Sequence, residues 1–399
     1  MYQLYCRMYQ FCLRAFSYFL PWRKPELLEG QNSLNKLAKL IKSKGIHNVL
    51  VVTDNGIASL GLMSGFLKSL ADNGVAFAVY DKTVPNPTIE NVEQALQLYK
   101  TNQCEGIVAF GGGSSMDCAK GVGALAVKPG KSISQIKGLL KVRKKIPPFF
   151  AIPTTAGTGS EATVAAVITD SSTHEKYVIN DLALISHYAV LDPLMTVGLP
   201  PAITSTTGID ALTHAIEAYI GKSNTRETRF LSKKAVKLIF ENIMNAYSDG
   251  TNLMARENML KASYYAGVAF TRAYVGNVHA IAHAVGGLYG IPHGLANAVI
   301  LPYVLEYYGE TVYKPLAELA DLVEIAKPSD TVAQKAERFI EAIKSLNRNM
   351  NIPGKISGII DSDIPLMVKR ALNEANPLYP VPKILSRNDL IAIYQLIKE

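Results

Sequence analysis

Short apolar segments alternate with helix-like stretches through the first half of this 399-residue chain. The apolar segments have β-branched centres, as expected of strands that are buried on both faces. Helix-like stretches separate them, such as Leu34–Lys44, which Ser33 caps and Gly45 closes. This alternation predicts an α/β domain with a parallel sheet and right-handed crossovers. We expect strands at Asn48–Thr53, Val75–Tyr80, Gly106–Phe110, Phe149–Ile152, Thr163–Thr169 and Ala189–Leu191.

The pattern changes after Asp192-Pro193, and from Pro201 onward the apolar residues recur with a helical period. The second half is therefore predicted to be an all-helical domain, joined to the first near residues 193–200. In proteins with two such domains, ligands usually bind in the cleft between them. Helices are expected at Leu212–Tyr219, Arg229–Ala246, Ala255–Phe270, Thr331–Leu346 and Asn388–Lys398.

Residues 1–24 form a separate extension, predicted to be an amphipathic helix. Its polar residues recur at spacings of four, three, four and three, which makes a narrow polar stripe on an apolar helix: Gln3, Arg7, Gln10, Arg14 and Ser17. The two arginines disfavour a transmembrane span, and no small-residue site follows that a signal peptidase would cleave. We expect the apolar face to pack on the chain's own body. A subunit interface and, after it, a membrane surface are the alternatives.

The composition is that of a packed globular protein, with 48% hydrophobic and 19% charged residues. Lys and Arg number 41 against 33 Asp and Glu, a net charge of +8, but the cations are scattered along the chain. Nucleic-acid binding needs a clustered basic patch and is not expected. The four cysteines show neither a CxxC pair nor a ladder of spacings, which favours a reducing, cytoplasmic compartment.

Two loops rich in glycine and hydroxyl groups follow predicted strands. Gly111–Ser115 lies where a strand passes into a helix, a position at which backbone N–H groups attract phosphate. By itself, a Gly-rich turn is explained equally well as a tight turn that binds no ligand. A second loop, Pro153–Ser160, makes an extended ligand along the sheet edge the better interpretation. Asp54 ends another strand, where it accepts hydrogen bonds from ribose hydroxyls or simply caps the next helix.

Histidines gather in the predicted helical domain. Asp210 and His214 are spaced i, i+4, as are His279 and His283, and His293 follows after Pro292. Pairs at this spacing lie on one helix face, and facing helices build metal sites from them. Three imidazoles and a carboxylate in apolar surroundings would be costly polar groups without a metal ion. The donor types suit Fe(II) or Zn(II).

The sequence resembles the iron-containing, group III alcohol dehydrogenases. Four stretches in order carry the resemblance: Gly111–Lys120 (GGGSSMDCAK), Pro153–Thr163 (PTTAGTGSEAT), Gly208–Tyr219 (GIDALTHAIEAY) and Val278–Asn297 (VHAIAHAVGGLYGIPHGLAN). The resemblance implies a Rossmann-like, nicotinamide dinucleotide-binding domain at residues 25–196 and a helical metal-binding domain at 197–399, in a dehydroquinate synthase-like architecture. The extension at residues 1–24 is not part of that pattern.

The resemblance also implies roles for individual residues. The implied metal ligands are Asp210, His214, His279 and His293. His283 is implied beside the substrate and the nicotinamide, where an imidazole relays a proton. The implied cofactor residues are Asp54, Gly112, Gly113, Ser114, Thr154, Thr155, Thr158 and, with differing flanking residues, Lys176.

We therefore expect a metal-dependent alcohol dehydrogenase that passes hydride between a small primary alcohol or diol and NAD(H). NADP(H) is less favoured because a carboxylate at Asp54 repels a 2′-phosphate. The expected metal is Fe(II), with Zn(II) as the alternative, and the expected assembly is a homodimer or larger homo-oligomer. Two rival functions are a dehydroquinate-synthase-like cyclase, which needs a basic substrate cleft, and a catalytically silent scaffold or membrane-docked assembly protein driven by the N-terminal helix.

Overall fold

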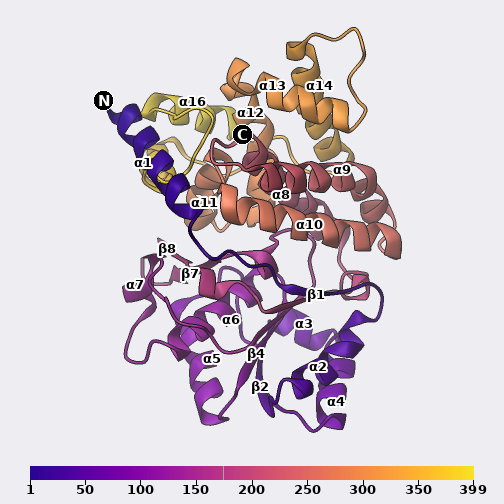
Figure 1. Cartoon of the computed structure of the whole chain (residues 1–399). Coiled ribbons are helices and arrows are strands. Elements are labelled where there is room, and N and C mark those ends of the chain that lie inside the picture. The colour runs from indigo at the N-terminus through magenta and orange to yellow at the C-terminus, as the bar shows by residue number, and fades with distance from the viewer. Residues whose placement is uncertain (174) are drawn as a thin grey trace. The chain divides into compact units, whose positions relative to one another are not determined.

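The computed structural model describes residues 1–173 and 175–399, which form two compact units. One unit is Pro21–Gly198, and the other is Leu199–Glu399 together with Met1–Leu20 (Figure 1). The N-terminal extension thus belongs with the helical part of the chain.

The unit Pro21–Gly198 contains a six-stranded parallel sheet in the order β1-β9-β6-β4-β2-β3. Parallel pairing agrees with the prediction, although the first strand was missed. Alternate residues of β2 serve two separate cores: Leu50 and Val52 face α5 and α6, whereas Val49 and Val51 face α2 and α4. The strands are β1 (Glu26–Glu29), β2 (Asn48–Val52), β3 (Ala76–Tyr80), β4 (Gly106–Gly111), β6 (Phe149–Pro153) and β9 (Tyr188–Leu191). The helices are α2 (Leu37–Ser43), α3 (Asn55–Ser59), α4 (Ser64–Asp72), α5 (Ile89–Thr101), α6 (Gly113–Ala126) and α7 (Ile133–Ile136).

A second, three-stranded sheet corrects the prediction for Thr163–Thr169. That segment supplies β7 (Ala165–Asp170), which pairs antiparallel with β8 (Glu175–Asn180) outside the main sheet. The third strand of this sheet is the short β5 (Gly138–Leu139). Buried and half-buried residues alternate along the first part of β7, so this strand is not covered on both faces. Its apolar residues resembled those of a central strand, because composition does not distinguish a strand covered on both faces from one covered on a single face.

The other unit is almost wholly helical after Leu199. Side chains of Thr225, Thr331 and Ser386 cap α9, α14 and α16, each in a reciprocal capping box. Helices α8, α9 and α10 pack on one another, and α11 packs against α12 and α15. The helices are α8 (Pro201–Ile220), α9 (Arg226–Ser248), α10 (Leu253–Ala273), α11 (Asn277–Tyr289), α12 (His293–Tyr308), α13 (Glu310–Leu322), α14 (Val332–Asn349), α15 (Ile364–Ala375) and α16 (Arg387–Ile397).

Helix α1 (Tyr2–Ser17) confirms the predicted helix but not the predicted orientation. Its polar stripe faces the body, where Gln10 is buried, while Leu4, Phe11 and Phe16 are exposed. The expectation that the apolar face packs on the chain's own body is therefore wrong. The physical reason is the surface beneath the helix, which presents backbone carbonyls that need donors. Within the described residues, no helix is both long and apolar enough to cross a membrane.

Candidate functional site

Four of the predicted site residues converge in the helical unit. Helix α8 carries Asp210 and His214 one turn apart, α11 carries His279 near its start, and α12 begins at His293. One ligand atom from each of the four lies within 4.8 Å of all the others. Three of the side chains are buried, and His293 is half-buried. The packing of α8, α11 and α12 thus brings together residues that are up to 83 positions apart in the sequence.

Asp210 lies at the centre of this cluster. Its Oδ1 atom is 3.6 Å from His293 Nε2 and 3.9 Å from His279 Nε2, and its Oδ2 atom is 4.0 Å from His214 Nδ1. These separations are too long for hydrogen bonds but are those of donor atoms arranged around a common point. Burial raises the pKa of Asp210, while the charge of His214 and a hydrogen bond from Asn297 act in the opposite direction.

A divalent metal ion fits this donor set. His279 Nε2 is buried and, within the described part of the chain, has no hydrogen-bond partner. Burial and the neighbouring histidines hold the pKa of His279 well below its usual range, so the ring is neutral. With Nδ1 engaged by Glu217, the lone pair on Nε2 points into the cluster. One carboxylate and three imidazoles are ligands that Fe(II) and Zn(II) accept.

Glu217 is a site residue that the sequence analysis missed. Its carboxylate accepts hydrogen bonds from Gly276 N and Val278 N, each at 2.8 Å, and lies 2.6 Å from His279 Nδ1. Burial raises the pKa of Glu217 to about 8, although backbone N–H groups of Gly276, Val278 and His279 favour its anion. Such a carboxylate fixes the tautomer and the ring orientation of a ligating histidine. A glutamate three residues after His214, on the same apolar helix, was the available signal.

Asn297 also supports the cluster. It lies one turn after His293 on α12, and its Nδ2 group donates to Asp210 Oδ1 at 2.6 Å. The same nitrogen is 3.1 Å from His293 Nε2. Asn297 therefore holds the carboxylate in place from the helix opposite to α8.

His283 lies beside the cluster but has its own partner. Its ring stacks on that of His293, with 5.1 Å between centroids, and its Nδ1 atom is 2.6 Å from Glu374 Oε1. The Tyr379 hydroxyl donates to the same oxygen at 2.8 Å. Glu374 lies on α15, 91 residues beyond His283, and no local pattern in the sequence pointed to it.

The predicted cofactor loops lie together at the carboxyl ends of neighbouring strands of the main sheet. Asp54 follows β2, Gly112 follows β4 and Thr154 follows the last residue of β6, and these three strands are neighbours. The chain adds β3 on one side of β2 and β4 on the other, so the order of strands reverses there. Ligands of open α/β sheets bind at such a reversal, outside the carboxyl ends of the strands.

Glycines allow the two loops to touch. A Cβ atom at Gly113 would lie 2.8 Å from Thr158 Cγ2, and one at Gly112 would lie 3.3 Å from Thr155 Oγ1. Helix α6 begins at Gly113, and its N-cap Gly112 has no side chain to cap the first N–H groups. Those N–H groups and the helix dipole favour an anion such as a pyrophosphate. Ser114, the next residue, accepts a hydrogen bond from Asn86 N at 3.3 Å.

Asp54 caps a helix, which is one of the two interpretations that the sequence left open. Its Oδ1 atom caps α3 by accepting from Ile57 N at 3.0 Å, and its Oδ2 atom accepts from the Ser115 hydroxyl at 3.4 Å. The residue is thus a helix cap that also reaches the glycine loop. Burial raises the pKa of Asp117 on α6 to about 6, and the charges of Lys120 and of Lys176, which lies on β8, oppose that rise.

Lys120 ties the same helix to the second loop. Its buried ammonium donates to the backbone oxygens of Ser160, Thr163 and Ala165 at 2.6, 3.0 and 2.9 Å. Burial lowers the pKa of Lys120 to about 8, although the nearby Asp117 and Glu161 favour its charged form. This lysine, which was not singled out from the sequence, fixes the end of the loop that carries Thr154, Thr155 and Thr158.

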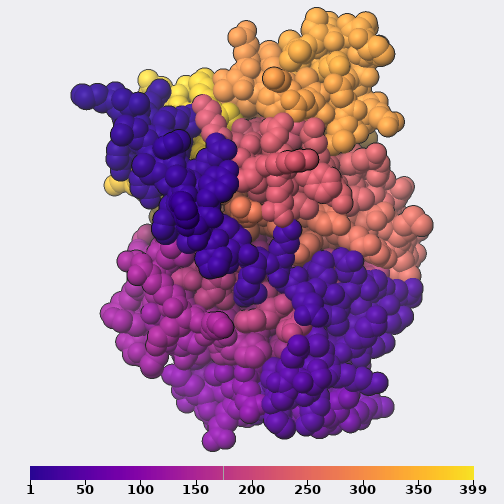
Figure 2. Space-filling view, in the orientation of Figure 1, coloured from indigo at the N-terminus to yellow at the C-terminus, as the bar shows by residue number. Residues whose placement is uncertain are grey.

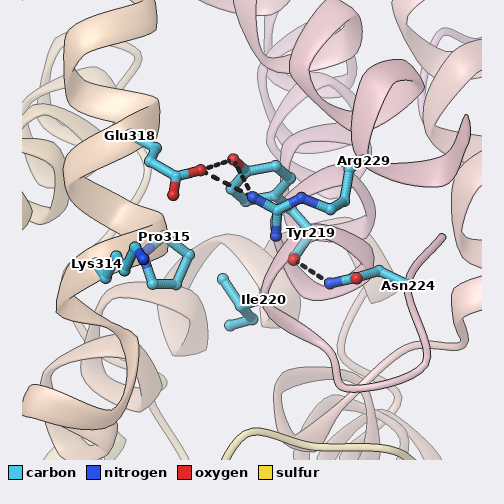
Figure 3. A pocket seen from close by; sticks show the side chains of 7 residues that line it. All are labelled: Tyr219, Ile220, Asn224, Arg229, Lys314, Pro315 and Glu318. Atoms are coloured by element: carbon cyan, nitrogen blue, oxygen red, sulfur yellow. Dashed lines mark hydrogen bonds and ion pairs between the residues drawn. The ribbon is translucent and has the colours of Figure 1, made fainter. Parts of the chain in front are cut away.

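A separate pocket of about 260 Å³ lies among α8, α9 and α13 (Figure 3). Arg229 Nη2 donates to the Tyr219 hydroxyl at 2.9 Å and to Glu318 Oε2 at 2.8 Å, and Tyr219 also donates to Glu318. Because these polar groups are paired with one another, we assign the pocket no ligand. Its lining residues are Tyr219, Ile220, Asn224, Arg229, Lys314, Pro315 and Glu318.

Comparisons with known proteins point to one family. The profile described as "Iron-containing alcohol dehydrogenase" matches residues 25–193, and "Fe-containing alcohol dehydrogenase family, C-terminal" matches residues 204–397. The 1,3-propanediol dehydrogenase of Klebsiella pneumoniae is 36% identical over 386 residues, 96% of this chain and 98% of the relative. Alcohol dehydrogenase 4 of Saccharomyces cerevisiae is 40% identical, over 87% of this chain and 90% of the relative. The crystal structure of a 1,3-propanediol oxidoreductase superposes with a TM-score of 0.90 at 36% identity, covering 94% of this chain and 99% of the other.

Proposed function

The chain belongs to the iron-containing alcohol dehydrogenase family, and from this premise we propose that it interconverts a small primary alcohol or diol with its aldehyde, using NAD(H) and one divalent metal ion. The observation that carries the proposal is the convergence of Asp210, His214, His279 and His293. Membership of the family removes the cyclase alternative. It leaves the silent scaffold to be tested by turnover.

The four converging residues would hold the metal ion, which we propose to be Fe(II), with Zn(II) able to take the same donors. When bound, the ion supplies a Lewis acid that favours loss of a proton from an alcohol hydroxyl or polarises a carbonyl. Glu217 keeps His279 in the tautomer that presents Nε2, and Asn297 holds the Asp210 carboxylate. These two supports keep the donor atoms in position without loop movement, because all of them lie on helices.

His283 is the proposed proton relay. Its Nδ1 atom is engaged by Glu374, which is itself held by the Tyr379 hydroxyl. A carboxylate at Nδ1 favours the tautomer whose Nε2 lone pair accepts a proton, and it stabilises the imidazolium that results. His283 can therefore take the hydroxyl proton of the alcohol and return it to an alkoxide in the reverse direction.

The proposed dinucleotide site lies at the carboxyl ends of β2, β4 and β6 in the main sheet. When bound there, the dinucleotide would supply the hydride acceptor for alcohol oxidation and the hydride donor for aldehyde reduction. The free N–H groups at the start of α6 would bind the pyrophosphate, with Gly112, Gly113 and Ser114. Hydroxyl groups of Thr154, Thr155 and Thr158 line the adjoining loop. The Asp54 carboxylate would accept from the adenosine ribose, which favours NAD(H) over NADP(H).

A small uncharged substrate fits the surroundings of the histidine cluster. Phe270 stacks on His214 with 4.1 Å between ring centroids, and the residues beside His279 on α11 are Val278, Ala280 and Ile281. The relatives named above act on 1,3-propanediol or carry the name of alcohol dehydrogenases. All four cysteines are free thiols, which supports the proposal of a cytoplasmic enzyme.

The test is anaerobic purification with metal analysis, followed by NADH oxidation against a panel of short aldehydes. We expect one divalent ion per chain and turnover of short aldehydes that is lost after chelation and regained with Fe(II). A chain that retains one metal ion per molecule but turns over none of the aldehydes or alcohols would favour the scaffold.

A further inference from the structure

Helix α1 is amphipathic with its polar face turned inward. Arg7 donates to the carbonyls of Val381 and Pro382 at 2.7 and 3.0 Å. Gln10, which is 5% exposed, donates to those of Tyr379 and Pro377 at 2.8 and 3.1 Å. The segment 377–382 contains three prolines and forms no helix or strand, so its carbonyls are not paired in a helix or sheet ladder. Arg7 and Gln10 supply donors to four of them.

A second anchor holds the other end of α1. Arg14 donates to the carbonyls of Lys222 and Asn224 at 3.1 and 3.4 Å. Three side chains of one stripe thus make six hydrogen bonds to the helical unit, and those of the arginines are charge-assisted. The helix is fixed to the body through its polar side, and its apolar side is directed away from it.

The outward face of α1 and the residues just after it form the largest gathering of exposed apolar side chains in the described chain. Of the twenty large apolar side chains that are exposed, ten lie within residues 1–19. Leu4 is 66% exposed, Phe11 72% and Phe19 86%. At about 100° per residue, the exposed positions Leu4, Tyr5, Met8, Tyr9, Phe11, Cys12, Ala15 and Phe16 cover roughly half of the helix circumference. Ten such side chains present on the order of 1,000 Å², more than the few hundred Å² typical of the largest patch on a monomer.

We propose that α1 docks the protein onto an anionic lipid surface. Figure 2 shows the first residues of the chain, in the darkest indigo, on the outside of the molecule. The family profile matches from residue 25 onward, after this helix. Residues 1–25 contain no acidic residue; Arg7 and Arg14 point to the body, and Arg23 and Lys24 follow the helix. Of the other 21 residues of this range, eight are tyrosine, phenylalanine or tryptophan, side chains typical of helices that lie in the headgroup region.

The shape and charge of α1 favour a lipid surface over a second copy of the chain. Two such ridges in contact would bury only the strip where they meet, whereas a fluid lipid interface surrounds the whole apolar half of the helix. The exposed Lys222 lies beside the C-terminal half of α1, and residues 1–25 contribute only positive charge. An anionic surface is complementary to this charge, and the cytoplasmic leaflet carries such lipids.

The test uses the exposed thiol at Cys12, which lies within the apolar half; the other three cysteines, all within the described chain, are buried. The full chain is labelled there with an environment-sensitive fluorophore and mixed with vesicles of phosphatidylcholine alone or with phosphatidylserine. We expect a blue shift and co-sedimentation with the mixed vesicles, with affinity about tenfold above that for phosphatidylcholine and decreasing with salt. The triple variant Leu4→Ser, Phe11→Ser, Phe16→Ser should bind at least about a hundredfold more weakly and keep its alcohol turnover.

Phe230→Ser is the matched control, since Phe230 is 56% exposed on α9 of the same unit and should not affect vesicle binding. Vesicle binding that is equal in the triple variant, or absent in the wild-type chain, would overturn the proposal. The proposal also fails if sedimentation velocity shows dimers that the triple variant dissociates while neither protein binds vesicles, because α1 would then serve a second copy.

Discussion

The two candidate sites of this protein are built by opposite means. In the helical unit, a site for a cation is made by burying side chains: Asp210 and three histidines face one another, and His279 Nε2 has no hydrogen-bond partner among the described residues. In the α/β unit, a site for an anion is made by omitting side chains, so that glycine backbone and the start of α6 are bare. The first site is therefore sensitive to what a substitution removes, and the second to what it adds.

The largest effect is expected from removing a ligand in the helical unit. His279→Ala should abolish retention of the metal ion and reduce turnover at least about a thousandfold, since a three-ligand site with a buried gap binds metal poorly. The measurement is metal content after gel filtration, with kcat for a short aldehyde.

His283→Ala, one turn later on the same helix, is the matched variant. It should keep one metal ion per chain and lose about a hundredfold in kcat, as expected for loss of a general acid or base. Equal metal loss in both variants would mean that His283 is a ligand and that the assignment of roles is wrong.

The second effect concerns the support of a ligand. Glu217→Gln keeps the shape of the side chain but cannot carry a negative charge beside His279 Nδ1, so metal affinity should decrease about ten- to a hundredfold. Competition with a chelator of known affinity measures the metal affinity of the variant. Glu318→Gln, which alters the paired carboxylate in the pocket of Figure 3, should leave metal affinity unchanged. If both variants bind metal as wild type does, Glu217 serves only the backbone of the loop before α11.

In the α/β unit, adding a single methyl group should be enough to weaken cofactor binding. Gly113→Ala places a Cβ atom 2.8 Å from Thr158 Cγ2, and the shift needed should weaken NADH binding about tenfold. Thr158→Ser removes that methyl and keeps the hydroxyl, so the double variant should regain most of the affinity. Gly65→Ala, where nothing lies within 4 Å, is the control. Fluorescence titration with NADH measures the affinity of each variant. An unchanged affinity in Gly113→Ala would mean that the loops do not bind the cofactor.

The smallest effect is a change of preference. Asp54→Gly removes the carboxylate that would repel a 2′-phosphate, and glycine costs the N-cap of α3 only a few tenths of a kcal/mol. The ratio of kcat/KM with NADH to that with NADPH should decrease roughly tenfold. A wild-type enzyme that already prefers NADPH would contradict the proposed role of Asp54.

Local patterns in the sequence predicted most of the fold and part of the site. Strands apolar on both faces predicted the parallel sheet. The i, i+4 pairs on α8 and α11 predicted a metal site, whereas the choice of ligands among the histidines came from the resemblance to the family. What could not be predicted depends on distant partners. Glu374 meets His283 from 91 residues away. The periodicity of α1 predicted the helix and its polar stripe, but the orientation of the helix depends on carbonyls of residues 377–382, which only the fold places beneath it.

The most direct test of the central claim is a titration of metal-free enzyme with Fe(II) under anaerobic conditions, with NADH formation from a short alcohol as the readout. If Asp210, His214, His279 and His293 hold the ion that the reaction needs, the rate should rise in proportion to bound metal and level off at one equivalent per chain. Full turnover by the metal-free chain, or a rate that does not follow bound metal, would contradict the claim.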